Sequence, residues 1–146
     1  MKTEPKVTFS AEEQAAMKAR AKELKAEAKR GASRAEGERA LLEVVEALPE
    51  STRTMGLRIH RVISENAPDL MPKTWYGMPA YANEEGKVVV FFRGAEKFKE
   101  RYLTLGFNDV AKLDEGVMWP IAYALTEVTP VEEVRIAELV RKAVGG

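Results

Sequence analysis

The sequence contains no cysteine and a single histidine, His60, among its 146 residues. Without cysteine the chain has no disulfide, no thiolate metal site and no cysteine nucleophile. One imidazole cannot supply a structural zinc site by itself, and no residue pattern gives His60 a catalytic partner. We expect it to be hydrogen-bonded locally at the edge of the core. The serines also lack a nucleophile-elbow motif, so the sequence offers no catalytic signature and does not favour an enzyme.

The chain also lacks net charge, because its 23 basic residues balance 23 acidic ones. A neutral total argues against a large electrostatic footprint for nucleic acid. The stretch "RGAEKFKERY", residues 93–102, interleaves basic and aromatic side chains, but Glu96 and Glu100 dilute its positive charge. We interpret this stretch as a solvated loop and expect no nucleic-acid partner.

Long apolar runs are missing as well. The start, "MKTEPKVTFSAEEQ", has no signal-peptide run, and no later segment approaches the length of a membrane span. A hydrophobic content of 45% and a charged content of 32% are typical of a soluble globular protein of one-domain size. We therefore expect a cytoplasmic protein with no membrane partner.

Residues 1–32 are expected to form a loose arm followed by a charged helix. Ser10 and Glu13 have the spacing of a capping box, a run rich in Ala, Lys and Glu continues to Arg30, and Gly31 fits the helix stop. The apolar stripe of this helix is thin: Met17, Ala21, Leu24 and Ala28. Such a stripe buries little surface, so we expect the helix to be dispensable for folding and available to pack on a partner.

Residues 33–146 are expected to form the main domain. The capping-box spacing of Ser33 and Glu36 predicts the start of a second helix that Pro49 closes, and a third helix is expected over residues 52–66. Each of these helices has a strong apolar face, formed by Leu41, Val44, Val45 and Leu48 in the second and by Met55, Ile59, Val62 and Ile63 in the third.

From Lys73 onwards the apolar pattern becomes that of strands. Residues 88–92 are apolar on both faces, which predicts a central strand, and "NEEG" before them predicts a hairpin turn. Further strands are expected over residues 80–82, 103–107 and 121–125, and Thr129, Pro130 and Glu132 predict the start of a final helix. This order favours an α+β class with a mainly antiparallel sheet of about four to five strands backed by helices.

Five stretches of the sequence carry a resemblance to a known family: "APDLMPKTWYGMPAY", "GKVVVFF", "RYLTLGF", "LDEGVMWP" and "AYALTE". With them, roughly residues 39–144 resemble the YdhG-like family (domain of unknown function 1801), and the first helix lies outside the resemblance. The resemblance implies a compact α+β domain with a curved antiparallel sheet, similar in shape to frataxin. Some relatives are described as intracellular iron chaperones, and the family has no agreed catalytic residues to transfer.

The aromatic stretch "KTWYGMPAY" has two interpretations. Its rings either fill the core or, as the functional hypothesis, line an apolar groove for a small molecule or a peptide, with residues Trp75, Tyr76, Met78, Tyr81 and Trp119. Alternate side chains of an extended segment point to opposite faces, so Trp75 and Tyr76 should not both be core residues. We predict that Trp75 packs inward and that Tyr76 lies at the groove.

Acidic residues in the stretch "NDVAKLDEG" are the candidate metal ligands. Oxygen ligands suit a hard ion, so Asp109, Asp114 and Glu115 could form a weak iron site of the kind that the family resemblance suggests. The alternative is that this loop collects Asp, Glu and Gly for backbone reasons, and its spacing is not that of an EF-hand. No other cofactor is expected.

The leading hypothesis is thus a non-enzymatic binding module of the YdhG-like type, with a groove framed by "WYGMPAY" and iron handling as a variant. The alternative is a protein-protein interaction or assembly module that acts through the N-terminal helix. Either a monomer or a homodimer is compatible with the sequence.

Overall fold

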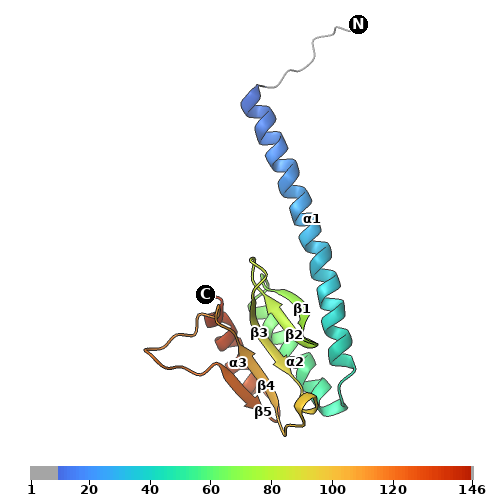
Figure 1. The fold of residues 1–146 in the computed structure, drawn as a ribbon, viewed down its shortest axis with the longest axis vertical. Coiled ribbons are helices and arrows are strands. Elements are labelled where there is room, and N and C mark those ends of the chain that lie inside the picture. Colours follow the sequence, from blue (N-terminus) through green and yellow to red (C-terminus); the bar gives the residue numbers. More distant parts are fainter. Residues whose placement is uncertain (1–9, 146) are drawn as a thin grey trace. The chain divides into compact units, whose positions relative to one another are not determined.

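The computed structural model describes residues 10–145, apart from the side chains of Glu23, Ala26, Glu27, Arg30 and Phe98. Figure 1 shows the helices and strands. In chain order they are α1 (Ala11–Glu46), α2 (Glu50–Asn66), β1 (Met71–Trp75), β2 (Met78–Ala82), β3 (Val88–Arg93), the short 3-10 helix η1 (Ala95–Phe98), β4 (Leu103–Phe107), β5 (Ala122–Leu125) and α3 (Pro130–Ala143). Helices combined with an antiparallel sheet confirm the α+β class.

Helix α1 is longer than the sequence pattern predicts. Its capping box is confirmed, since the Ser10 N–H donates to Glu13 Oε1 (2.8 Å) and the Glu13 N–H donates to Ser10 Oγ (3.1 Å). The predicted stop at Gly31 and new start at Ser33 are wrong, because α1 continues through both. A glycine inside a helix costs only about 1 kcal/mol relative to alanine, and the flanking residues are strong helix formers. The chain nevertheless divides into two compact units between Ser33 and Arg34.

The five strands form one sheet in the order β1-β2-β3-β4-β5, and every neighbouring pair is antiparallel. The predicted hairpin is present between β2 and β3, where Asn83 Oδ1 accepts hydrogen bonds from the N–H groups of Glu85 and Lys87, each at 3.0 Å. Strand β3 is central, as its apolar pattern predicts. Strands β1 and β5 are the two edges of the sheet.

One face of the sheet, called the core face below, packs against the helices. Its cross-strand partners include Tyr81 with Val90, Val90 with Phe107, and Phe92 with Leu105. These residues share one buried cluster with Leu41, Val45, Ile59, Val62, Ile63, Ile136, Ala137, Val140 and Ala143 of α1, α2 and α3. Figure 1 shows α2 and α3 behind the strands. The core therefore lies between the sheet and the apolar faces of the helices.

The opposite face of the sheet, called the outer face below, carries a different set of side chains. Because side chains alternate along a strand, the residues between those of the core face point to this side. They are Lys73, Trp75, Met78, Ala80, Phe91, Arg93, Thr104, Gly106, Ala122 and Ala124. None of these residues belongs to the buried cluster between the sheet and the helices.

The last part of α1 lies directly against β1. Arg34 donates a hydrogen bond from Nη1 to the Leu70 carbonyl oxygen at 2.9 Å. At Gly37 an added Cβ would lie 2.0 Å from the backbone oxygen of Pro72. Only a residue without a side chain allows the helix and the strand to approach this closely.

Helix α3 begins as the sequence predicts. The Thr129 N–H donates to Glu132 Oε1 (2.8 Å), Thr129 Oγ1 accepts from the Val131 N–H (3.3 Å), and Pro130 lies in the first turn. The hydrogen bonds from the side chain and backbone of Thr129 hold the pKa of the Glu132 carboxyl below its ordinary value. The start of α3 is therefore determined locally.

Candidate functional site

Trp75 and Tyr76 lie at the tight turn that joins β1 to β2. Trp75 pairs with Met78 across the turn. The two residues between them, Tyr76 (φ 51°) and Gly77 (φ 75°), both have positive φ, which is the pattern of a type I′ hairpin turn. The predicted alternation of Trp75 and Tyr76 is therefore wrong, because Tyr76 belongs to a turn and not to an extended strand.

The two rings differ strongly in exposure. Tyr76 is 78% exposed, whereas Trp75 is half-buried. We predicted that Trp75 packs into the core, and this prediction is wrong. Trp75 lies on the outer face, because its register partner is Met78 and not a core-face residue. Left-handed backbone is uncommon for a bulky residue, and Lys97 supports it by donating from Nζ to the Tyr76 carbonyl oxygen at 2.8 Å.

Three aromatic rings form a contiguous surface on the outer face, called the aromatic platform below: Trp75, Tyr76 and Phe91. The ring centroids of Trp75 and Tyr76 are 5.0 Å apart at an interplanar angle of 68°, and those of Trp75 and Phe91 are 5.2 Å apart at 58°. Edge-to-face and tilted contacts of this kind are favourable between aromatic rings. The platform thus extends from the exposed turn to the middle strand of the sheet.

Gly106 determines where the ring of Phe91 lies. The two residues are register partners on β3 and β4, and a Cβ at Gly106 would come within 2.4 Å of the Phe91 ring. The ring therefore lies across the backbone of β4 at a position where any side chain would displace it. A glycine inside a strand commonly marks such a close approach.

The charged groups beside the platform are mostly basic. Lys73 lies two residues before Trp75 on the same strand and on the same face. Lys97 lies at the turn. Arg93 is engaged by Glu100, with Nε and Oε1 3.4 Å apart. The strands themselves contribute no carboxylate to the outer face. The ammonium groups of Lys73 and Lys97 therefore determine the net charge beside the platform.

Tyr81 lies in the core and not at a groove. It is 1% exposed, and its hydroxyl lies 2.8 Å from His60 Nδ1. His60 Nε2 in turn lies 2.8 Å from Glu38 Oε2. If the Glu38 carboxylate accepts from Nε2, a neutral imidazole carries its proton on Nε2 and accepts at Nδ1 from the Tyr81 hydroxyl. His60 is thus buried and hydrogen-bonded to residues distant in the sequence. We predicted that it lies at the edge of the core with a hydrogen-bond partner nearby in the chain.

Replacing Tyr81 with phenylalanine is expected to change the stability of the protein in a pH-dependent way. Burial, and secondarily Glu38, raises the pKa of Tyr81 well above its ordinary value of 10.0. The unfolded chain therefore loses this proton at lower pH than the folded protein, so the stabilisation is present below pH about 10 and is lost as the pH rises towards the folded-state pKa. Urea melts should show a smaller alkaline loss of stability for Tyr81→Phe than for the original chain.

At neutral pH the same variant should be less stable by about 1 to 3 kcal/mol, because the buried Nδ1 of His60 loses its donor. Melts at pH about 7, 9 and 10.5 separate the two effects. Equal pH slopes for the two chains would contradict the assignment of the raised pKa to Tyr81.

Trp119 lies apart from the platform. It packs against the core cluster and lines a cleft of about 680 Å³ together with Asp109 and Asp114. Met78 is buried beside Trp75. The five residues predicted to line one groove therefore lie in three places: the platform, the core and the cleft at Trp119. The predicted single groove is not formed.

The predicted metal ligands are also separated. Asp109 and Asp114 line the cleft at Trp119, whereas Glu115 accepts from Lys142 Nζ on α3 at 3.0 Å. Within residues 10–145 no group of three His, Cys, Asp or Glu side chains is arranged to hold a metal ion. The prediction that Asp109, Asp114 and Glu115 together form a metal site is therefore wrong, since close positions in a loop do not bring the carboxylates to one point.

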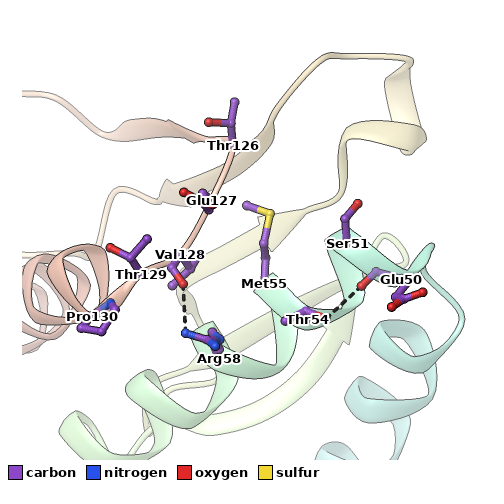
Figure 2. A pocket seen from close by; sticks show the side chains of 10 residues that line it. All are labelled: Glu50, Ser51, Thr54, Met55, Arg58, Thr126, Glu127, Val128, Thr129 and Pro130. Carbon is purple, nitrogen blue, oxygen red and sulfur yellow. Dashed lines mark hydrogen bonds between the residues drawn. The ribbon is translucent and has the colours of Figure 1, made fainter.

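A further open cleft, of about 810 Å³, lies between the first turns of α2 and the segment that connects β5 to α3 (Figure 2). Two of the polar side chains that line it are hydrogen-bonded to the protein's own backbone. Thr54 Oγ1 donates to the Glu50 carbonyl oxygen (3.0 Å), and Arg58 Nη1 donates to the Val128 carbonyl oxygen (3.2 Å). The other charged lining residues, Glu50 and Glu127, are acidic. We therefore place the candidate site at the platform.

No family model, no curated protein and no solved structure matches this chain. The YdhG-like resemblance accordingly remains a prediction from the sequence motifs. Among the helices in the part of the chain that the structure describes, none has both the length and the apolar character of a membrane span.

The sequence pattern did not identify Phe91 as a platform residue or Gly106 as the residue that positions its ring. Phe91 was counted only as part of an apolar strand. The glycine inside "RYLTLGF" was the available signal, because an isolated glycine in a strand often marks a close approach of another group. Only the register of β3 on β4 identifies that group as the Phe91 ring.

Proposed function

We propose that residues 34–145 form a non-enzymatic binding module whose ligand lies on the aromatic platform. The observation that supports this proposal is the position of Tyr76, which is 78% exposed in left-handed backbone and in contact with a second ring. Strained backbone and exposed aromatic side chains both cost free energy, and features of this kind cluster at binding sites. The turn therefore keeps a large apolar ring at the surface instead of burying it.

The ligand class that suits this surface is a planar aromatic small molecule with an anionic group. Rings of Trp75, Tyr76 and Phe91 offer faces and edges on which a planar group packs. The ammonium groups of Lys73 and Lys97 flank the rings, and the strands place no carboxylate on this face. An anionic group at the rim of the platform would thus meet a complementary charge.

The YdhG-like family and a cytoplasmic location fit this proposal but rest on the sequence alone. A domain with a sheet backed by helices on one face leaves the other face available for a ligand. The iron-handling variant receives no support from the separated carboxylates of Asp109, Asp114 and Glu115. We therefore propose an organic ligand in its place.

The test uses 8-anilinonaphthalene-1-sulfonate, an aromatic anion with a planar naphthalene ring, as the probe. In a Trp119→Phe background Trp75 is the single tryptophan, so quenching of its emission reports binding at the platform. We expect saturable quenching, and an increase in Kd of about tenfold, or about 1.4 kcal/mol, when Tyr76 is replaced with alanine. Gly106→Ala should weaken binding similarly, because it displaces Phe91 and leaves the other two rings in place.

Met118→Ser is the matched control, since Met118 is exposed in the loop that follows β4, away from the platform. Circular dichroism in the near ultraviolet must show that each variant keeps its packed fold, because this probe also binds loosely packed proteins. Unchanged binding in both Tyr76→Ala and Gly106→Ala, or a loss in Met118→Ser, would contradict the proposal.

A further inference from the structure

Strand β5 leaves one edge of the sheet open. It is the last strand in the sheet order, it pairs with β4 on one side, and no strand within residues 10–145 pairs with its other side. Its outer-face residues Ala122 and Ala124 are exposed. An open edge presents unpaired backbone N–H and C=O groups, to which an extended peptide can add as a further strand.

The loop before β5 exposes large apolar side chains next to this edge. Val117 is 100% exposed, Met118 is 86% exposed and Ile121 is 55% exposed. Figure 1 shows this connection projecting beyond the ends of β4 and β5. Exposed apolar side chains that cluster in this way mark interaction surfaces.

The loop is held in place at both ends, so its exposed tip is a feature of the fold. The Asn108 N–H donates to the Val89 carbonyl oxygen (3.0 Å), the Lys112 N–H donates to the Ala143 carbonyl oxygen (2.8 Å), and the Phe107 N–H donates to the Ile121 carbonyl oxygen (2.8 Å). Leu113 is buried in the core. The tip at Val117 and Met118 thus extends from an anchored base.

The charge beside this surface indicates the chemistry of its partner. The cleft at Trp119 is lined by Asp109 and Asp114 and by no basic side chain. Glu115, the next carboxylate, is paired with Lys142. An apolar surface with two unneutralised carboxylates favours a partner that carries both apolar and basic side chains.

We propose that β5 and the 116–121 loop bind an extended, basic and apolar peptide segment of a partner protein as a sixth strand. The peptide backbone pairs with the open edge of β5, its apolar side chains contact Ile121 and Trp119, and its basic side chains face Asp109 and Asp114. A second copy of this chain is a poorer occupant, because its own cleft at Trp119 would bring the same carboxylates and no basic side chain.

The test measures fluorescence polarisation with a labelled peptide, acetyl-Thr-Val-Thr-Val-Thr-Val-Lys-Lys. We expect saturable binding that weakens about tenfold when the two lysines are replaced with glutamates, and about tenfold when the central valine is replaced with proline, which removes a backbone donor. On the protein, Met118→Ser and the double variant Asp109→Asn/Asp114→Asn should each raise the Kd about fivefold. Hydrogen exchange of the β5 amides should slow when the peptide is bound.

Tyr76→Ala is the matched control, because it removes a platform residue and leaves this surface intact. Its peptide affinity should stay within about twofold of the original chain, so failure here and failure of the platform proposal are distinguishable. Equal affinity for the lysine and glutamate peptides would overturn the proposal. Sedimentation that detects a dimer of the peptide-free chain, abolished by Met118→Ser, would overturn it in favour of a second copy.

Discussion

Truncation of Phe92 to alanine is expected to lower the free energy of unfolding by about 3 to 5 kcal/mol. Phe92 is fully buried on the core face, pairs with Leu105 and packs against α2 at Gly56. Its removal costs the transfer free energy of the ring and leaves a cavity that neighbouring strands and helices cannot fill. Denaturant melts of the purified variant provide the measurement.

Phe91→Ala is the control for this prediction, because it removes the same ring from the neighbouring position. Phe91 is only half-buried and lies on the outer face. We expect its loss to cost about 1 to 2 kcal/mol, since part of the ring already contacts water. The sequence pattern places the two rings on opposite faces of the strand but does not distinguish how deeply each is buried. If Phe91→Ala were as destabilising as Phe92→Ala, the assignment of the two faces would be incorrect.

Replacing Gly37 with alanine is expected to destabilise the protein by about 3 kcal/mol or more, through overpacking against backbone. The added Cβ would lie 2.0 Å from the Pro72 carbonyl oxygen. Neither partner is the end of a flexible side chain, so the helix or the strand must move. That movement would also strain the hydrogen bond from Arg34 to Leu70. Thermal melts followed by circular dichroism would measure the loss.

Gly31→Ala is the matched control for Gly37→Ala. Both glycines lie inside α1, but a Cβ at Gly31 would meet nothing within 4 Å beyond its chain neighbours and the backbone of its own helix turn. Helix propensity alone favours alanine by about 1 kcal/mol at each position. We therefore expect Gly31→Ala to keep or raise the melting temperature. If the two variants changed the melting temperature by similar amounts, the close contact of Gly37 with β1 would not affect stability.

Several elements that depend on local sequence were predicted correctly, although the local signals at Gly31 and Ser33 failed because α1 continues through both. The capping residues Ser10 with Glu13 and Thr129 with Glu132 need only their neighbours in the chain, and both caps are present. The hairpin turn at Asn83 is equally local. The apolar faces of α2 and α3 likewise follow from spacing, because they repeat with the helical period.

The candidate site was predicted only in part. Trp75 and Tyr76 were recognised as a pair of which one ring stays accessible, but the platform partner Phe91 was not. A Tyr-Gly turn lacks the Asn-Gly or Asp-Gly signature that identifies a type I′ hairpin, so the turn was interpreted as extended chain. That single misassignment also directed Trp75 towards the wrong face of the sheet.

By itself the sequence determined the α+β class, the exclusion of thiol chemistry and the helix starts at Ser10 and Thr129, because composition, periodicity and capping act within a few residues. Only the tertiary structure decided which aromatic rings share a surface. Strand register selects the face to which each side chain points, and a shift of one residue would reverse it. The contacts of Phe91 with Gly106, and of Tyr81 with His60, join residues far apart in the chain. They form only when the whole sheet has packed against its helices.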